Sequence, residues 1–441
     1  MWIKTSQRWR IVSASLIFGV LLALLLILPL AAQEITPARP MVDQQAQVIV
    51  QLDAQAQLVR AITFTEAISG LKALELTGLD VVTKSYSFGD AVCRIAGIGC
   101  PAEDCFCSTN YWSYWYWEGG AWQGYPVGAS NSVISQTGAV EGWRWGQFGD
   151  TLRPATVTLQ SQAALDWLAG QRASVGSPSS TGVAVEDALA LGANQQRDQA
   201  INDYLAVNGA AYARTSAAAA GKLAVALAAA DACQPAGALT PVSYYSPTLG
   251  AYSTQSGANA WAILGVVAHN ASTSPSAVSY LAAQMQPDGG WEWAPGWGSD
   301  TNTTALAIQA LLATGEPLSA TAVISGLAYL DALQGTDGGF PYAAGDNAVS
   351  DTNSTAYVVQ ALVAASEDPT APRWTSGGKT PFDYLLGMQL ADGSFEWQPG
   401  TGANLLATQQ AIPALLGRAH PLTRRDLEAC PGIYLPLAQQ D

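Results

Sequence analysis

Charged residues are scarce in this chain of 441 residues, and positive charge is the scarcer sign. Asp, Glu, Lys and Arg together make up 12% of the residues, and 34 acidic side chains against 19 basic ones give a formal net charge of −15. A chain this acidic lacks the basic surface that attracts nucleic acids and anionic membranes. Neither is therefore expected as a partner.

Long hydrophobic runs are also lacking, except at the N-terminus. There the uncharged apolar run from Ile11 to Leu28 follows three basic residues and precedes the small residues Ala31 and Ala32. This layout is typical of a secretory signal peptide at 1–32, although a run of this length also suffices for a membrane anchor. In both cases the rest of the chain is expected to be secreted or extracytoplasmic.

Histidine and cysteine, common zinc ligands, are few, with two histidines and six cysteines. Four cysteines lie within 15 residues and have no histidine near them: Cys93, Cys100, Cys105 and Cys107. Their spacing fits zinc only loosely, and export favours two disulfides over a metal site. No metal site is predicted. The remaining Cys233 and Cys430 are predicted to form a bridge that joins the start of the helical region to its end.

Changes in composition predict a multidomain, mainly α chain with a small β-rich domain before a helical domain. Two domains are also what this chain length favours. The predicted parts are the signal peptide or anchor, a linker, the β-rich domain, the helical domain and a tail, at 1–32, 33–47, 48–148, 149–430 and 431–441.

The β-rich domain is recognised by its aromatic strands. Strands are predicted at 48–52, 111–117 and 122–125, with a short helix at 69–74 and a closing segment at 143–145. Nearly every residue of 111–117 is aromatic. One face of this strand is therefore expected to stay available unless another domain covers it, which makes Trp115 and Trp117 candidates for ligand contact.

One sequence pattern recurs three times in the C-terminal half. Each copy has a Gln, an Asp-Gly turn and an aromatic residue, followed by a helix of small residues. The turn residues Asp288, Asp337 and Asp392 recur at intervals of 49 and 55 residues. Repetition at such a period indicates stacked supersecondary units.

The helical domain is predicted to be an α/α toroid of about six helical hairpins. One helix of each pair is apolar nearly all round, as expected of an inner helix that is covered on both faces. Helices are predicted at 160–171, 183–192, 196–206, 213–231, 256–269, 275–286, 302–314, 319–334, 354–366, 380–389 and 405–417.

The residues just before three inner helices are predicted N-caps: Asp300, Asp351 and Asn404. Inner-helix N-termini all point to one end of a toroid, so these residues are expected to gather at one mouth, beside positive helix-dipole ends. They are either N-caps alone or N-caps that also border a ligand site.

A loop with extra tryptophans is expected at the same mouth. Trp291 occupies the repeated aromatic position and is expected in the core. Trp293 and Trp297 have no evident counterpart in the third copy, and only Tyr342 lies nearby in the second. These three aromatic residues are candidates for contact with a flat apolar ligand, or alternatively for packing on the toroid's own rim.

The Gln…Asp-Gly-Gly-Trp/Phe units and the Asp-Thr-Asn-Thr-Thr-Ala helix starts resemble prenyltransferase/squalene oxidase repeats. The resemblance implies a terpenoid-cyclase-like α/α toroid. The chain departs from this family in three motifs that it lacks. They are the Asp-x-Asp-Asp acid of class II cyclases, the Asp/Cys/His zinc site of protein prenyltransferases and the Cys-Gly-Glu-Gln thioester motif. Each chemistry associated with the resemblance is thus without its residues.

The segments Gly70–Leu74, Tyr111–Trp115 and Gly142–Trp145 look like the β-domain of the transcobalamin/intrinsic-factor group. That resemblance implies a flat or amphipathic ligand, such as a corrinoid, clasped between the toroid mouth and the β-domain. The order of domains is reversed relative to that group, and no histidine stands near Asp300 to bind cobalt.

Three functions remain open at this stage. The first is an exported, non-catalytic protein that binds a small organic ligand. The second is a cell-surface protein-interaction or adhesion module that docks another protein on its aromatic face. The third is a squalene-cyclase-like terpenoid enzyme, in which Asp300 or Asp351 would be the proton donor. No catalytic residue is assigned, and the enzyme reading is the least favoured.

Overall fold

The structure is a computed structural model that describes residues 43–87 and 89–422. The predicted signal peptide or anchor, most of the predicted linker, Cys430 and the predicted tail lie outside these residues. From Gln44 onward the described residues belong to one compact unit. Within them, no helix is both long and apolar enough to cross a membrane.

A five-stranded sheet opens the described chain, in the order β2-β1-β8-β6-β7. Its strands are β1 (Gln44–Gln51), β2 (Gln57–Phe64), β6 (Tyr111–Glu118), β7 (Ala121–Gly124) and β8 (Ala139–Gly146). All neighbouring strands are antiparallel except β1 and β8, which are parallel. The strands predicted at 48–52, 111–117 and 122–125 are present, whereas β2 was not predicted and β1 begins inside the predicted linker.

Successive side chains of the strands point to opposite faces of the large sheet, and the two faces pack on two different hydrophobic cores. On one face Val48 and Trp112 pack with the short helix α2 (Gly70–Leu76). This core also takes residues from a small sheet of β3 (Val81–Tyr86), β4 (Gly89–Ile95) and β5 (Ile98–Gly99).

The opposite face of the large sheet packs on the helical domain. Ile49, Val59, Trp115 and Trp117 lie against its core, next to helix α3 (Ala155–Val175). The aromatic face that was expected to stay available is therefore covered by the chain's own helical domain.

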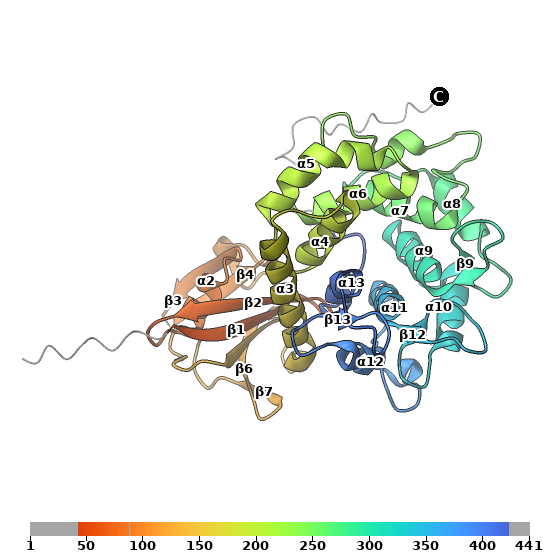
Figure 1. The fold of residues 1–441 in the computed structure, drawn as a ribbon. Helices are drawn as coiled ribbons and strands as arrows, with labels where there is room; N and C mark the ends of the chain where they lie inside the picture. The colour runs from red at the N-terminus through yellow and green to blue at the C-terminus, as the bar shows by residue number, and fades with distance from the viewer. Residues whose placement is uncertain (1–42, 88, 423–441) are drawn as a thin grey trace, which may run out of the picture. The chain divides into compact units, whose positions relative to one another are not determined.

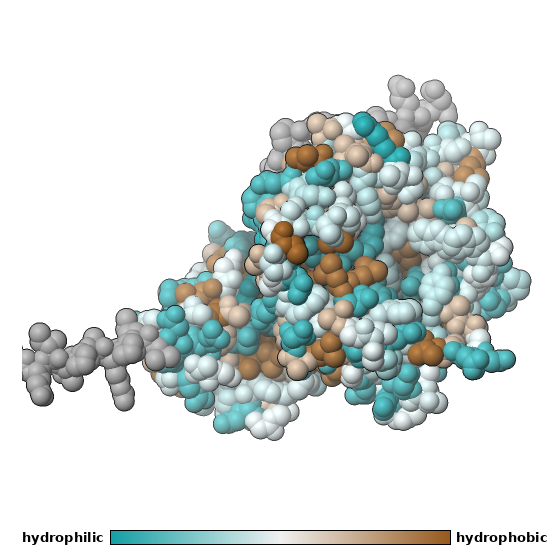
Figure 2. Space-filling view, viewed as in Figure 1, coloured by the Kyte–Doolittle hydropathy of each residue, from teal (hydrophilic) through white to brown (hydrophobic). Residues whose placement is uncertain are grey.

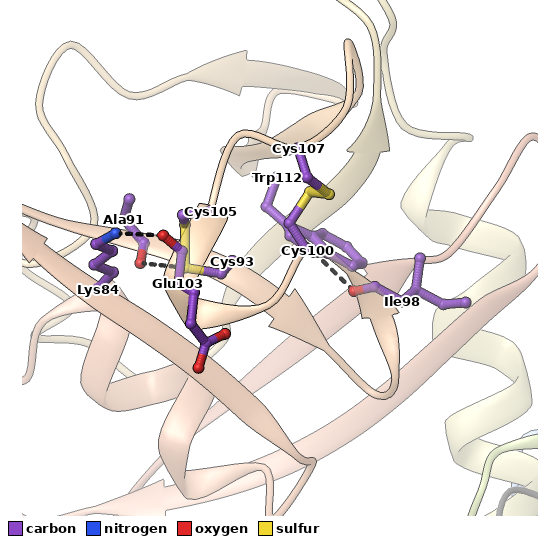
Figure 3. The surroundings of a disulfide bond; sticks show 9 residues. All are labelled: Lys84, Ala91, Cys93, Ile98, Cys100, Glu103, Cys105, Cys107 and Trp112. Atoms are coloured by element: carbon purple, nitrogen blue, oxygen red, sulfur yellow. Dashed lines mark hydrogen bonds between the residues drawn. A yellow bond between two sulfur atoms is a disulfide. The ribbon is translucent and has the colours of Figure 1, made fainter.

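Two disulfides fasten the small sheet (Figure 3). Cys93 is bonded to Cys105, and Cys100 to Cys107. Beside them the indole Nε1 of Trp112 donates a hydrogen bond of 3.2 Å to the carbonyl of Ile98. The predicted pair of disulfides is confirmed, and such bonds fit an oxidising, extracytoplasmic compartment.

Six inner helices form a closed ring, as their order in Figure 1 shows. Each contacts the next, and the last contacts the first. They are α4 (Thr181–Ala193), α6 (Ala217–Ala229), α7 (Ser256–Ala268), α9 (Thr301–Ala313), α11 (Thr352–Ala364) and α13 (Leu405–Leu415). Contact between α13 and α4 closes the ring, so closure is visible without the predicted Cys233–Cys430 bridge.

Outer elements pack outside the ring, each before its inner partner in the chain. They are α3, α5 (Gln199–Ala213), η2 (Pro241–Tyr244), α8 (Pro275–Ala283), α10 (Thr321–Leu333) and α12 (Pro381–Met388). One of the six outer positions is thus a short 3₁₀ helix. All eleven predicted helices of this domain are present, and the described chain as a whole is mixed, with several small sheets beside the helices.

Small residues let neighbouring inner helices approach closely. A Cβ on Gly221 of α6 would lie 2.2 Å from the carbonyl oxygen of Trp261 on α7, and one on Gly265 of α7 would lie 2.7 Å from the Cα of Gly221. No larger side chain fits at this crossing. Glycine here therefore sets the distance between two helices of the ring.

The three repeated turns share one hydrogen-bonding scheme. The carboxylates of Asp288, Asp337 and Asp392 each accept a bond of 3.0 Å from the backbone N–H two residues later. They are turn residues, as predicted. The aromatic residue that follows each turn is fully buried and donates its backbone N–H to a threonine hydroxyl of the next inner helix: Trp291 to Thr304, Phe340 to Thr355 and Phe395 to Thr408.

The sheet domain docks at the C-terminal ends of inner helices. The backbone N–H of Val59 donates to Oδ1 of Asn194, the C-cap of α4, at 2.8 Å, and the N–H of Gln57 donates to the carbonyl of Leu416 after α13 at 2.9 Å. These contacts lie at the end of the ring opposite to the N-caps. The expectation that the β-rich domain faces the mouth at the N-terminal ends is therefore wrong.

Candidate ligand site at the toroid mouth

A pocket of about 360 Å³ opens at the N-terminal ends of the inner helices. It is lined by residues from α7, α9, α11, α13 and the loops between them: Trp261, Trp293, Asp300, Asn302, Thr303, Leu306, Tyr342, Asp351, Asn353, Ser354, Tyr357, Trp397, Leu406 and Gln410. On the face shown in Figure 2, hydrophobic residues gather near the centre, over the region of α4 and α13. A concave site with an apolar lining and several polar groups is typical of small-molecule binding.

Three aromatic side chains of the wall occupy equivalent positions in the repeats. Each stands two residues after a buried repeat aromatic, and each lines the pocket: Trp293, Tyr342 and Trp397. All three border the volume of the same pocket, so their side chains are accessible to a ligand.

Trp397 is the counterpart of Trp293 in the third repeat, so the prediction that Trp293 has none there is wrong. Trp297 corresponds to Thr401 and has no aromatic counterpart. Both loops read Glu-Trp-x-Pro-Gly-x-Gly, at 292–298 and 396–402. Glu292 accepts the backbone N–H of Gly296 at 2.8 Å, and Glu396 accepts that of Gly400 at 3.0 Å. One carboxylate thus folds each loop in the same way, and the tryptophan after it faces the pocket.

The predicted N-caps are confirmed. Asp300 accepts the N–H of Thr303 at 2.7 Å, Asp351 that of Ser354 at 2.8 Å, and Asn404 that of Ala407 at 2.9 Å. The hydroxyls of Thr303 and Ser354 donate to the second oxygens of the same carboxylates. Two of these three caps, Asp300 and Asp351, also line the pocket.

The aromatic wall residue of the next repeat lies beside each of those two carboxylates. Tyr342 lies beside Asp300, and Trp397 beside Asp351. Burial raises the pKa of both carboxyls above the usual range, and the hydrogen bonds oppose this rise. Burial, together with the charge of Asp300, also raises the pKa of the Tyr342 hydroxyl.

The floor of the pocket is built from one position of the inner helices. The sixth residue after each N-cap points to the centre of the toroid, and we call this set the lumen ring: Glu186, Lys222, Trp261, Leu306, Tyr357 and Gln410. Four of its members line the pocket, from Trp261 on α7 to Gln410 on α13.

The other two members of the lumen ring are an ion pair. Lys222 Nζ is bonded to Glu186, and it also lies 5.2 Å from the ring centroid of Trp261. Gln410 Nε2 donates to the same Glu186 oxygen at 3.0 Å, and Asn353 Nδ2 donates to Gln410 Oε1 at 2.7 Å. This continuous network fills the lumen from α11 across α13 and α4 to α6.

A segment from the end of the described chain packs behind the floor. The His420 ring lies 5.2 Å from that of Trp261, and its backbone N–H donates to Gln309 at 2.9 Å. Burial and the nearby charge of Lys222 lower the pKa of His420 to about 3, so this ring is neutral at pH 7. The pocket is therefore a cup with a closed floor.

The structure brings together only some of the predicted site residues. Trp293, Asp300, Tyr342 and Asp351 line one pocket. Asn404 caps α13 at the same end but does not line it, and Trp297 is 72% exposed at the loop tip. Trp115 and Trp117 pack between the sheet and the helical domain. The single cleft expected to hold Trp115, Trp117, Trp293 and Trp297 is therefore not formed.

Ten lining residues were missed: Trp261, Asn302, Thr303, Leu306, Asn353, Ser354, Tyr357, Trp397, Leu406 and Gln410. Trp397 carried a usable signal in the shared Glu-Trp-x-Pro-Gly-x-Gly spacing. The lumen ring carried none in residue type, because its six members differ, and only their constant distance from the N-cap identifies them. Among the residues that the structure describes, no three His, Cys, Asp or Glu side chains are placed to hold a metal ion.

Comparisons with known proteins give matches to solved structures only. No protein-family model and no curated protein sequence matches the chain. Partial similarity is found to ent-copalyl diphosphate synthase from Streptomyces platensis, at 19% identity over 54% of this chain and 50% of that one, with a TM-score of 0.40. The chain thus spans half the length of that enzyme.

Two further matches cover most of the other protein. The type II terpene cyclase MstE from Scytonema is 14% identical over 59% of this chain and 97% of its own, with a TM-score of 0.44. A Candida albicans protein geranylgeranyltransferase-I complexed with GGPP is 14% identical over 60% and 91%, with a TM-score of 0.43. These neighbours are terpene cyclases and prenyltransferases at low sequence identity. The description of this chain as a toroid is based on the contacts between its own inner helices.

Proposed function

We propose that the chain is an exported, non-catalytic protein that binds a small amphipathic organic ligand at the toroid mouth. The observation that carries this proposal is the cup of about 360 Å³, with three equivalent aromatic side chains as wall and the lumen ring as floor. The polar groups of its lining, such as Asn353 and Gln410, are already held in place by hydrogen bonds. Preorganised groups of this kind lower the entropic cost of binding.

The sheet domain has no part in this revised proposal. It docks at the opposite end of the inner helices, so the ligand is held by the toroid alone. A corrinoid remains a prediction that no observation tests. A cup of this volume lies at the lower end of the range for small-molecule pockets and would leave much of such a macrocycle outside.

The terpenoid-enzyme reading depends on Asp300 and Asp351, whose raised pKa values are a feature of proton donors. Both carboxylates, however, are N-caps with bonds to both oxygens. A proton on either would compete with these bonds. The arrangement therefore favours a structural role that also shapes the pocket.

A protein-interaction module is the second candidate. Exposed apolar side chains surround the mouth, among them Trp297, Val349 and Leu406, which are exposed by 72%, 53% and 45%. Such a rim suits a protein partner as well as the tail of an amphipathic ligand. The two functions differ in the tryptophans that they use: a ligand in the pocket contacts Trp293 and Trp397, whereas a protein on the rim contacts Trp297.

A thermal-shift screen of organic ligands tests the proposal, followed by calorimetry on variants. Ligand at about 100 times its Kd should stabilise the fold by about 2.7 kcal/mol. The double variant Trp293→Ala, Trp397→Ala should lose most of the affinity, and Trp297→Ala, from the same type of loop but outside the pocket, should keep it. Equal affinity in all three proteins would refute the site, and loss only in Trp297→Ala would favour the docking of a partner on the rim.

A further inference from the structure

The pocket has an unusual balance of charge. None of the described residues that line it is basic, two are carboxylates, and five are aromatic: Trp261, Trp293, Tyr342, Tyr357 and Trp397. The nearest positive charge at the floor, Lys222, is already paired with Glu186. An anionic group such as a diphosphate or a carboxylate would find no positive partner in the lining.

A positive group would find two kinds of partner. Ammonium groups are attracted to the faces of tryptophan and tyrosine rings, and most strongly where water is excluded. The chain already uses one lining ring in this way, because Lys222 Nζ lies over Trp261 at 5.2 Å. The carboxylates of Asp300 and Asp351 add a negative field, which the positive ends of α9 and α11 reduce but do not reverse. The net charge of −15 adds long-range attraction for cations.

We propose that the toroid mouth binds a small organic cation, an alkylated or quaternary ammonium compound. This inference deepens the proposed function and depends on it, since both concern the same pocket. The rings of Trp293, Tyr342 and Trp397 surround the ammonium group, and Asp300 and Asp351 balance its charge.

The test compares choline with 3,3-dimethylbutan-1-ol (dimethylbutanol below). This alcohol is the neutral isostere of choline, in which carbon replaces the quaternary nitrogen. Each is titrated into the full chain and followed by calorimetry and tryptophan fluorescence. A ligand of this size is expected to bind with a Kd of about 1 mM. Choline should bind about tenfold more tightly than dimethylbutanol, and added salt should reduce that difference.

Two sets of variants separate this inference from the proposed function. Trp397→Ala should abolish choline binding, with Trp297→Ala as the unaffected control. Asp300→Asn with Asp351→Asn should weaken choline severalfold and leave dimethylbutanol unchanged. The caps should survive this change, because Asn404 already caps α13.

Each outcome of these titrations supports or overturns the cation assignment. Equal binding of the two probes, lost in Trp397→Ala, would overturn the cation assignment and leave the pocket as a binding site. Failure of both probes, while neutral compounds from the screen bind at the mouth, would also overturn it. Failure of both probes together with an empty screen would remove the proposed function as well.

Discussion

The backbone carbonyl of Tyr342 accepts the N–H of Thr301, the first residue of the preceding inner helix, at 2.8 Å. The same relationship recurs one repeat later, where the carbonyl of Trp397 accepts the N–H of Thr352 at 2.9 Å. Both aromatic residues line the pocket beside the carboxylates that cap these helices, Asp300 and Asp351. Each aromatic wall residue is thus fixed to the helix start of its neighbour. The pocket is therefore formed before any ligand arrives.

Removing the Tyr384 hydroxyl should destabilise the protein. Tyr384→Phe removes the donor of a 2.6 Å hydrogen bond to the carbonyl of Ser350, from a side chain that is 6% exposed. The expected loss is about 1–2 kcal/mol of unfolding free energy, measured by denaturant titration. Tyr329→Phe is a matched control, since its buried hydroxyl has no hydrogen-bond partner, and the change there should be neutral or stabilising. Equal losses in the two variants would show that the Tyr384–Ser350 bond contributes nothing.

Breaking the lumen ion pair should cost more than breaking an exposed one. The side chains of Lys222 and Glu186 are 17% and 11% exposed. Lys222→Met therefore leaves the charge of Glu186 without its cation in the lumen. A loss of about 2–4 kcal/mol is expected, and adding Glu186→Gln should restore most of it. Lys72→Met breaks the exposed pair with Glu75 and should change stability by less than about 1 kcal/mol. Similar small losses for both lysines would contradict the buried network.

Cation binding should weaken as the pH falls, and it should do so at a higher pH than the pKa of an ordinary aspartate would suggest. Burial raises the pKa values of Asp300 and Asp351, so their charge is lost as pH falls through values above the usual one of about 3.9. Tyr342 faces the first carboxyl and Tyr384 the second, and both hydroxyls stay neutral in this range. Calorimetry from neutral to acid pH measures the loss. Asp300→Asn with Asp351→Asn should flatten the profile, and an unchanged profile would exclude these carboxyls as its source.

The sheet domain holds a buried carboxylate that favours the folded state at low pH, so its effect runs opposite to the loss of cation binding in acid. Glu141 is 2% exposed and accepts bonds from Tyr114 at 2.5 Å and Tyr125 at 3.0 Å, and burial raises its pKa. Its contribution is therefore fully present below the unfolded pKa and is lost as pH rises through the folded one.

Two substitutions test this. Relative to Glu141→Gln, the natural protein should gain stability on acidification. Glu141→Ala should cost about 1–2 kcal/mol, because two half-buried hydroxyls lose their acceptor. Unfolding curves at several pH values provide the measurement, and a parallel response of the natural protein and Glu141→Gln would contradict the account.

Much of the fold could be predicted because its signals are local. The apolar, small-residue helices, the Asp-Gly turns and the N-caps Asp300, Asp351 and Asn404 are each encoded within a few residues. All of these features are present in the structure. Ring closure was also predictable, since stacked hairpins with inner helices apolar on all sides must bury them on both faces.

The rest depended on long-range packing. Nothing near Val59 or Gln57 indicates that the sheet domain docks at the C-terminal ends of α4 and α13, and this docking removed Trp115 and Trp117 from the candidate site. Trp297 was overvalued because it is an aromatic residue in a loop, although its side chain points to solvent. Trp397 was missed because the third repeat was compared by its changed turn and cap, rather than by its intact Glu-Trp-x-Pro-Gly-x-Gly loop.

The most direct measurement of the central claim is fluorine NMR of the chain labelled with fluorotryptophan, titrated with choline. Single Trp→Phe variants assign the resonances. If choline binds at the toroid mouth, saturable shifts are expected at Trp293, Trp397 and Trp261, with Trp115, Trp117 and Trp122 unchanged. Shifts confined to Trp297, or to the tryptophans of the sheet domain, would contradict a ligand site at the toroid mouth.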